Sequence, residues 1–93
     1  MRIEYRDAIE VTERIRILLE TEDTFSPFRM RVSFANGCLA SIIRYKDTYG
    51  YDEGLFELAI VSPIGRLGEP EGYLDSLDVL LALAEIDLGK RTT

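Results

Sequence analysis

Residues 28–45, FRMRVSFANGCLASIIRY, contain the pattern that decides the fold. Apolar residues alternate with Arg and Ser from Phe28 to Phe34, which is the two-residue period of a strand with one buried face. Asn36-Gly37 follows, the dipeptide most typical of a two-residue type I′ turn. A second run rich in apolar residues comes after the turn. The sequence therefore predicts a β-hairpin.

A two-residue turn also fixes the expected register of this hairpin. It pairs Ala35 with Cys38, and the other pairs follow by counting outward along both strands. One face then carries Phe34 with Leu39, Val32 with Ser41, Met30 with Ile43, and Phe28 with Tyr45. The other face carries Arg29 with Arg44, Arg31 with Ile42, and Ser33 with Ala40. This second face is mixed in character, so it is either solvated or open to a partner.

The remaining elements are predicted outward from the hairpin. Residues 55–62 alternate in the same way and are expected to pair antiparallel with the second hairpin strand. Helical spacing predicts one helix over residues 8–22, capped by Asp7 and Glu10, and another over residues 75–88, stopped by Gly89. Residues 63–74 are expected to be a loop, and residues 1–5 either an extension or a strand. The expected fold is α+β, a single domain over residues 1–93 in the order αβββα, with a three-stranded antiparallel sheet packed against two helices.

The second expected helix is unusually apolar. Its narrow polar stripe is expected to comprise Asp75, Asp78, Ala82 and Glu85. Two interpretations are open: the helix fills the groove between the first helix and the sheet, or a partner or second copy of the chain covers part of it.

The composition excludes several classes of catalytic and metal site. The 93 residues include no His and a single cysteine, Cys38, which excludes His-based catalysis, Cys/His zinc sites and an internal disulfide. No nucleophile with a supporting base stands out, so neither an enzyme nor a cofactor or metal is expected. No apolar run is long enough to span a bilayer, and the N-terminus lacks the apolar core of a signal peptide. A cytoplasmic location is therefore expected.

Acidic residues concentrate in the second half of the chain. The net charge is −6, yet residues 47–87 alone hold ten acids against one base, Arg66. Such a bias repels nucleic-acid phosphates and membrane surfaces, and it attracts a basic protein surface. Solubility is the alternative explanation.

Two loops of the acidic half are the candidate binding sites. Residues 46–54, KDTYGYDEG, combine acids with tyrosines, and aromatic anchors beside charges are typical of protein recognition. Residues 68–73, GEPEGY, add two acids ahead of the second helix, where they also stabilise the helix dipole. The candidate partner-binding residues are Asp47, Tyr49, Tyr51, Asp52, Glu53, Glu69 and Glu71. Either loop is also explained as an ordinary connection.

Residues 49–60, YGYDEGLFELAI, and Gly72-Tyr73-Leu74 at the expected start of the second helix resemble small phage and prophage proteins of unknown function. The resemblance extends from about Phe34 to Leu88, and because its motifs are structural it implies no catalytic or binding residues. In topology and acidity alone, the chain is also similar to phage anti-CRISPR inhibitors that present carboxylates to the DNA-binding groove of an RNA-guided nuclease.

The leading hypothesis is a non-enzymatic, phage-type acidic binding protein. It would be an anti-CRISPR-like inhibitor whose carboxylates imitate nucleic-acid phosphates and occupy a basic surface of a host protein, in the host cytoplasm. Direct binding to nucleic acid or to a membrane is not expected. The alternative is a homo-oligomeric structural or accessory phage protein, such as a homodimer. It would assemble through the apolar second helix or through the sheet face of Arg29, Arg31 and Arg44.

Overall fold

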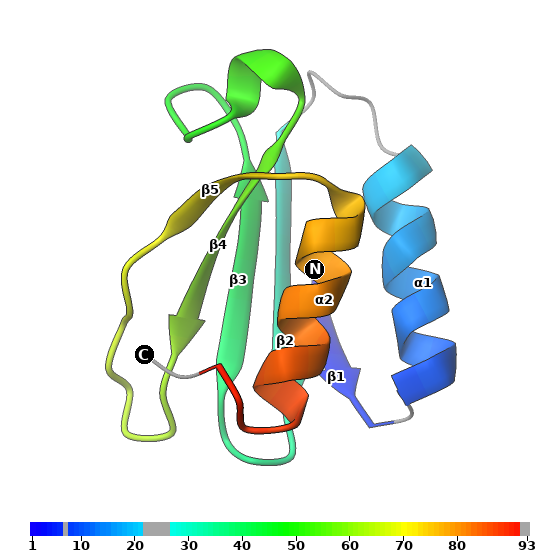
Figure 1. Cartoon of the computed structure of the whole chain (residues 1–93), viewed down its shortest axis with the longest axis vertical. Helices are drawn as coiled ribbons and strands as arrows, with labels where there is room; N and C mark the ends of the chain where they lie inside the picture. Colours follow the sequence, from blue (N-terminus) through cyan, green and yellow to red (C-terminus); the bar gives the residue numbers. More distant parts are fainter. Residues whose placement is uncertain (7, 22–26, 92–93) are drawn as a thin grey trace.

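The computed structural model describes residues 1–6, 8–21 and 27–91, in which two helices and a five-stranded mixed sheet form an α+β fold (Figure 1). In chain order the elements are β1 (Arg2–Tyr5), α1 (Ala8–Thr21), β2 (Phe28–Phe34), β3 (Leu39–Arg44), the 3-10 helix η1 (Tyr51–Glu53), β4 (Phe56–Val61), β5 (Glu71–Leu74) and α2 (Ser76–Asp87). The strands lie side by side in the order β1-β2-β3-β4-β5. β1 runs parallel to β2, and the other neighbouring strands are antiparallel.

The predicted three-stranded antiparallel sheet is wrong at both edges. Residues 2–5 form β1, and α1 is the crossover that a parallel pairing with β2 requires. Residues 71–74, expected in a loop and at the start of a helix, form β5 on the opposite edge. With four residues each, both strands are too short for an alternating pattern to reveal them.

The predicted hairpin is present, but its register is shifted by one residue. The observed pairs are Phe28 with Arg44, Met30 with Ile42, Val32 with Ala40, and Ser33 with Leu39. The turn spans residues 35–37, all of them described, and Gly37 alone has a positive φ there, of 90°. A type I′ turn needs a positive φ at Asn36 as well. Instead the Asn36 side chain donates to the Ile86 carbonyl (2.8 Å) and accepts from the Cys38 amide (3.0 Å), so the turn is fastened to α2.

This shift moves every β3 side chain to the face opposite the predicted one. Ala40, Ile42 and Arg44 are buried on the core side, whereas Leu39, Ser41 and Ile43 are half-buried on the outer face. The predicted grouping of Arg29, Arg31 and Arg44 on one face is therefore wrong. Arg29 and Arg31 are exposed on the outer face, but Arg44 lies in the core and is 3% exposed.

Both helices cover the same face of the sheet (Figure 1), and the core is the layer between them and the strands. Ile15 and Leu19 of α1 are buried there. α2 buries Val79, Ala82, Leu83 and Ile86, so the expectation that Ala82 belongs to the polar stripe is wrong.

The predicted ends of α2 are confirmed. Asp75 accepts a hydrogen bond from the Asp78 amide (2.8 Å), and Asp78 accepts one from the Asp75 amide (3.2 Å), which completes a capping box. Gly89 follows the helix with a φ of 73°. For α1, the predicted cap Asp7 and end Glu22 lie outside the described residues.

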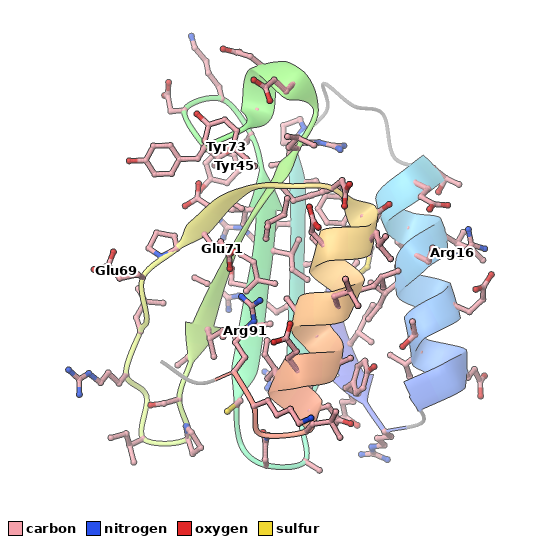
Figure 2. All side chains as sticks on the ribbon, viewed as in Figure 1. Arg16, Tyr45, Glu69, Glu71, Tyr73 and Arg91 are labelled. Carbon is pink, nitrogen blue, oxygen red and sulfur yellow. The ribbon has the colours of Figure 1, made fainter. Side chains whose placement is uncertain are left out.

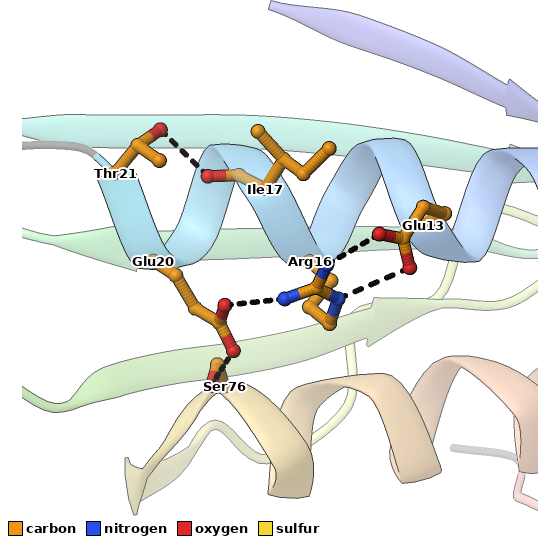
Figure 3. A network of polar contacts seen from close by, with 6 residues as sticks. All are labelled: Glu13, Arg16, Ile17, Glu20, Thr21 and Ser76. Carbon is orange, nitrogen blue, oxygen red and sulfur yellow. Dashed lines mark hydrogen bonds and ion pairs between the residues drawn. The ribbon is translucent and has the colours of Figure 1, made fainter.

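A polar network joins α1 to α2 at the surface (Figure 3). Arg16 donates to Glu13 through Nε (3.1 Å) and to Glu20 through Nη1 (2.7 Å), while Ser76 of α2 donates to the other oxygen of Glu20 (3.4 Å). The hydrogen bonds with Glu13 raise the pKa of Arg16 and lower the pKa of Glu13. Since these side chains are substantially exposed, the network contributes little to the stability of the fold.

Candidate functional site

Residues 46–54 connect β3 to β4 at one end of the sheet, with η1 inside the connection (Figure 1). Five of the seven predicted site residues lie in this loop: Asp47, Tyr49, Tyr51, Asp52 and Glu53. They line a hollow of about 400 Å³ together with Lys46, Thr48 and Gly50 of the same loop and Tyr73 of β5. The structure thus brings the acids and tyrosines of the loop together and adds one tyrosine that sequence reasoning missed.

Tyr49 and Tyr73 form an aromatic pair at the surface. Their ring centroids are 6.5 Å apart and their planes are inclined by 25°, which is a stacked arrangement. The two residues remain 60% and 58% exposed. An exposed aromatic pair offers apolar contact area and a π-face to a cation. No sequence pattern pointed to Tyr73, because only the pairing of β5 with β4 places it beside the loop.

Two residues that line this hollow have an uncommon backbone conformation. Among the residues that the structure describes, Asp47 and Tyr73 are the two non-glycine residues with positive φ, at 79° and 60°. Aspartate adopts this conformation fairly often, whereas a bulky tyrosine there is rare and costs about 1 kcal/mol or more, so the surroundings must enforce it at Tyr73. Strained residues of this kind cluster at binding and catalytic sites. Their coincidence at one hollow distinguishes it from the rest of the surface.

Two glycines allow the loop to lie directly against β5. A Cβ added at Gly72 would be 2.3 Å from the Cβ of Tyr49, and one added at Gly50 would be 3.0 Å from the Cα of Tyr73. Real Cβ atoms do not approach to 2.3 Å, so glycine is required at position 72. At position 50 the contact with Tyr73 is tight, and the φ of 92° also favours glycine. The Tyr73 amide also donates to the Tyr49 carbonyl (3.4 Å). The tyrosine pair is therefore positioned by backbone contacts.

Side-chain hydrogen bonds hold the 46–54 loop in place. Glu57 of β4 accepts a hydrogen bond from the Tyr49 amide (3.0 Å). The Thr48 hydroxyl donates to the Tyr45 carbonyl (2.7 Å), close to the end of β3. A loop held in this way loses little conformational entropy on binding, which favours affinity.

Arg44, which was predicted to lie on the outer sheet face, is buried and contacts the end of the 46–54 loop. Its guanidinium carbon lies 4.6 Å from the ring centroid of Phe56 and 5.9 Å from that of Phe28, within the range of cation–π attraction. Its Nη1 donates to the Gly54 carbonyl at 3.4 Å. A buried side chain thus links the end of the loop to the aromatic part of the core.

The other two predicted site residues lie farther along the β5 side of the molecule (Figure 2). Glu71 forms an ion pair with Arg91 (2.5 Å), which also contacts Glu85 (3.4 Å). Partial burial alone would lower the pKa of Arg91, but the two carboxylates outweigh it and raise that pKa. Glu71 is therefore engaged within the protein. Glu69 lines a different shallow hollow with Arg66.

Across the described ranges, no group of three or more His, Cys, Asp and Glu side chains is placed to hold a metal ion. Nor does any described helix combine the length and apolarity needed to cross a membrane. Comparisons of the chain with protein-family models, with curated proteins and with solved structures find no match. The function must therefore be inferred from the site itself.

Proposed function

We propose that the protein is a non-enzymatic binding protein that engages a basic surface of a protein partner. The contact would be made by the tyrosine–acid site, defined as Asp47, Tyr49, Tyr51, Asp52, Glu53 and Tyr73. The observation that supports this best is the exposed Tyr49–Tyr73 stack, in which Tyr73 has a positive φ. The stack borders a hollow whose described lining residues include three carboxylates and one cation, Lys46.

The chemistry of this site favours arginine in the partner. A guanidinium group is planar, so it stacks on a tyrosine face while its N–H groups bind carboxylates. The acidic character of residues 47–87 adds long-range attraction to a basic surface and repels nucleic acid. In its most specific form, the proposal is a phage-type inhibitor whose carboxylates replace phosphates on a nucleic-acid-handling host protein.

Neutralising the three acids tests the proposal. The variant Asp47→Asn/Asp52→Asn/Glu53→Gln keeps the shape of each side chain, and Asn tolerates the positive φ at position 47. We expect it to bind a fluorescent decaarginine peptide at least about tenfold more weakly, because three charge-assisted contacts are lost. Fluorescence anisotropy at low and high salt measures the affinity.

The matched control removes three acids elsewhere. Glu4→Gln/Glu10→Gln/Glu20→Gln changes the net charge equally, at exposed positions on β1 and α1. It should retain most of the affinity. Equal weakening by both variants would show that net charge alone drives binding, and the tyrosine–acid site would then lose its assigned role.

The second candidate function is a homodimer formed through the outer sheet face. Arg29, Ile43 and Glu57 lie directly beside one another across β2, β3 and β4. A twofold axis running along β3 would place Arg29 of each copy opposite Glu57 of the other, with Ile43 at the centre. This self-complementary row supports assembly through the sheet face.

Ile43→Arg tests this candidate by placing two like charges at the dimer centre. If the protein is a dimer by this route, the variant should sediment as a monomer at concentrations where the unmodified chain is dimeric. Ile64→Arg is the control, because Ile64 is 88% exposed and lies outside the sheet. Monomeric behaviour of the unmodified chain at every concentration would eliminate the candidate.

A further inference from the structure

The outward side of α2 carries an apolar ridge made of Leu77, Leu81, Ala84 and Leu88. The three leucines are 62%, 55% and 67% exposed, and Ala84 is half-buried. The side of the helix that faces the sheet is already filled by the core residues from Val79 to Ile86. α2 is therefore apolar on two opposite sides, and only one of them is used by the fold.

The spacing of the ridge is that of a coiled-coil seam. Its members follow one another at steps of four, three and four residues, which is the a/d repeat that packs against a second helix. Scattered exposed leucines are ordinary, but a continuous stripe at this spacing is the pattern that binds another helix. This spacing favours a helix as the segment that would pack on the ridge.

The charged residues beside the ridge indicate which charge a bound helix would carry. In the heptad frame set by Leu81 and Ala84, Asp78 and Glu85 occupy one flank and Asp87 the other. Asp87 is exposed. Asp78 is also exposed, although its carboxylate accepts a hydrogen bond from the Asp75 amide in the capping box, and Glu85 contacts Arg91. A second copy of α2 would oppose acids to acids, and an anionic membrane would be repelled. A helix with Lys or Arg beside its apolar stripe is instead attracted.

We infer that the α2 ridge is a docking site for an amphipathic helix of a protein partner, one with apolar a and d positions and basic flanks. This surface is distinct from the tyrosine–acid site, and the inference does not rest on the proposed function of that site. The molecule would thus present two surfaces that select basic partners, one for arginine side chains and one for a helix.

Two synthetic helical peptides with identical leucine seams, one flanked by Lys and one by Glu, test the inference. Fluorescence anisotropy with the full chain should give at least about tenfold tighter binding of the Lys-flanked peptide. Leu81→Glu should weaken that binding at least about tenfold, since a charge enters the seam. Leu67→Glu, at a loop leucine that is 66% exposed, should leave it unchanged.

Two further variants separate this site from its alternatives. Asp87→Lys should reduce the preference for the Lys-flanked peptide, because the flank loses its acid. Asp47→Asn/Asp52→Asn/Glu53→Gln should bind the peptide as the unmodified chain does, since the ridge is elsewhere. Equal binding of both peptides, equal effects of Leu81→Glu and Leu67→Glu, or loss of peptide binding in the triple variant would each overturn the inference. So would a dimer of the chain that Leu81→Glu dissociates.

Discussion

Gly50→Ala is expected to lower the free energy of unfolding by about 3 kcal/mol, through backbone strain and overpacking together. Gly50 has a φ of 92°, where an L side chain is strained whatever space surrounds it. Its added Cβ would also lie 2.9 Å from the Cβ of Leu55 and 3.0 Å from the Cα of Tyr73. Relief of these contacts is expected to move the loop relative to Leu55 and Tyr73, so the variant should also lose decaarginine binding. Urea denaturation measures the stability.

Gly65→Ala is the matched control for Gly50→Ala. Gly65 has a similar φ of 82°, but an added Cβ meets nothing within 4 Å. Gly65→Ala should lower the free energy of unfolding by about 1 kcal/mol, through backbone strain alone. The difference between the two variants measures the crowding of position 50 against Leu55 and Tyr73. Equal losses of stability would mean that this approach is unimportant.

Arg44→Ala is expected to lower the free energy of unfolding by about 3 kcal/mol, because a large buried side chain is removed from beside two aromatic rings. The variant would lose the contacts with Phe28 and Phe56 as well as the hydrogen bond to Gly54. Since Gly54 closes the 46–54 loop, the variant should also weaken decaarginine binding. Urea denaturation and fluorescence anisotropy report the two effects separately.

Conservative changes show what Arg44 contributes. Arg44→Lys keeps the charge but replaces a planar, weakly hydrated group with a strongly hydrated ammonium, so it should still cost about 2 kcal/mol. Arg44→Met keeps the length and apolar packing, and we expect a smaller loss. Arg29→Lys, at an exposed position on β2, should change stability by less than about 0.5 kcal/mol. If Arg44→Lys is as neutral as Arg29→Lys, stacking of the guanidinium on the rings is unimportant.

The hairpin illustrates how far local patterns predict the fold. The alternation from Phe28 to Phe34 correctly predicted β2 and its buried face. The predicted register was wrong because Asn36-Gly37 also fits a longer turn, and the observed turn is accompanied by a contact of Asn36 with Ile86, which is distant in sequence. Since one residue of register reverses a whole strand face, the same shift moved Arg44 from the predicted outer face to the core.

The candidate site was predictable where it is continuous in sequence. The acids and tyrosines of residues 46–54 lie together because they share one loop. Tyr73 was missed because β5 is short and its pairing with β4 is set by tertiary contacts. The positive φ of Asp47 is equally invisible in sequence, since aspartate is also common in ordinary turns.

α2 shows a different limit of sequence reasoning. Its excess of leucine was evident, and so was the need for burial on more than one side. Which leucines face the core was not evident, because apolar residues lie on two opposite sides of the helix. The structure buries Leu83 and exposes Leu81, so only the latter is a suitable position for a surface test.

The most direct test of the central claim is an NMR titration of the isotope-labelled chain with decaarginine, following every backbone amide. Binding at the tyrosine–acid site predicts shift changes confined to residues 46–54 and to β5 around Tyr73. Shift changes on α2 or on the outer face of β2, β3 and β4, with residues 46–54 unaffected, would contradict it.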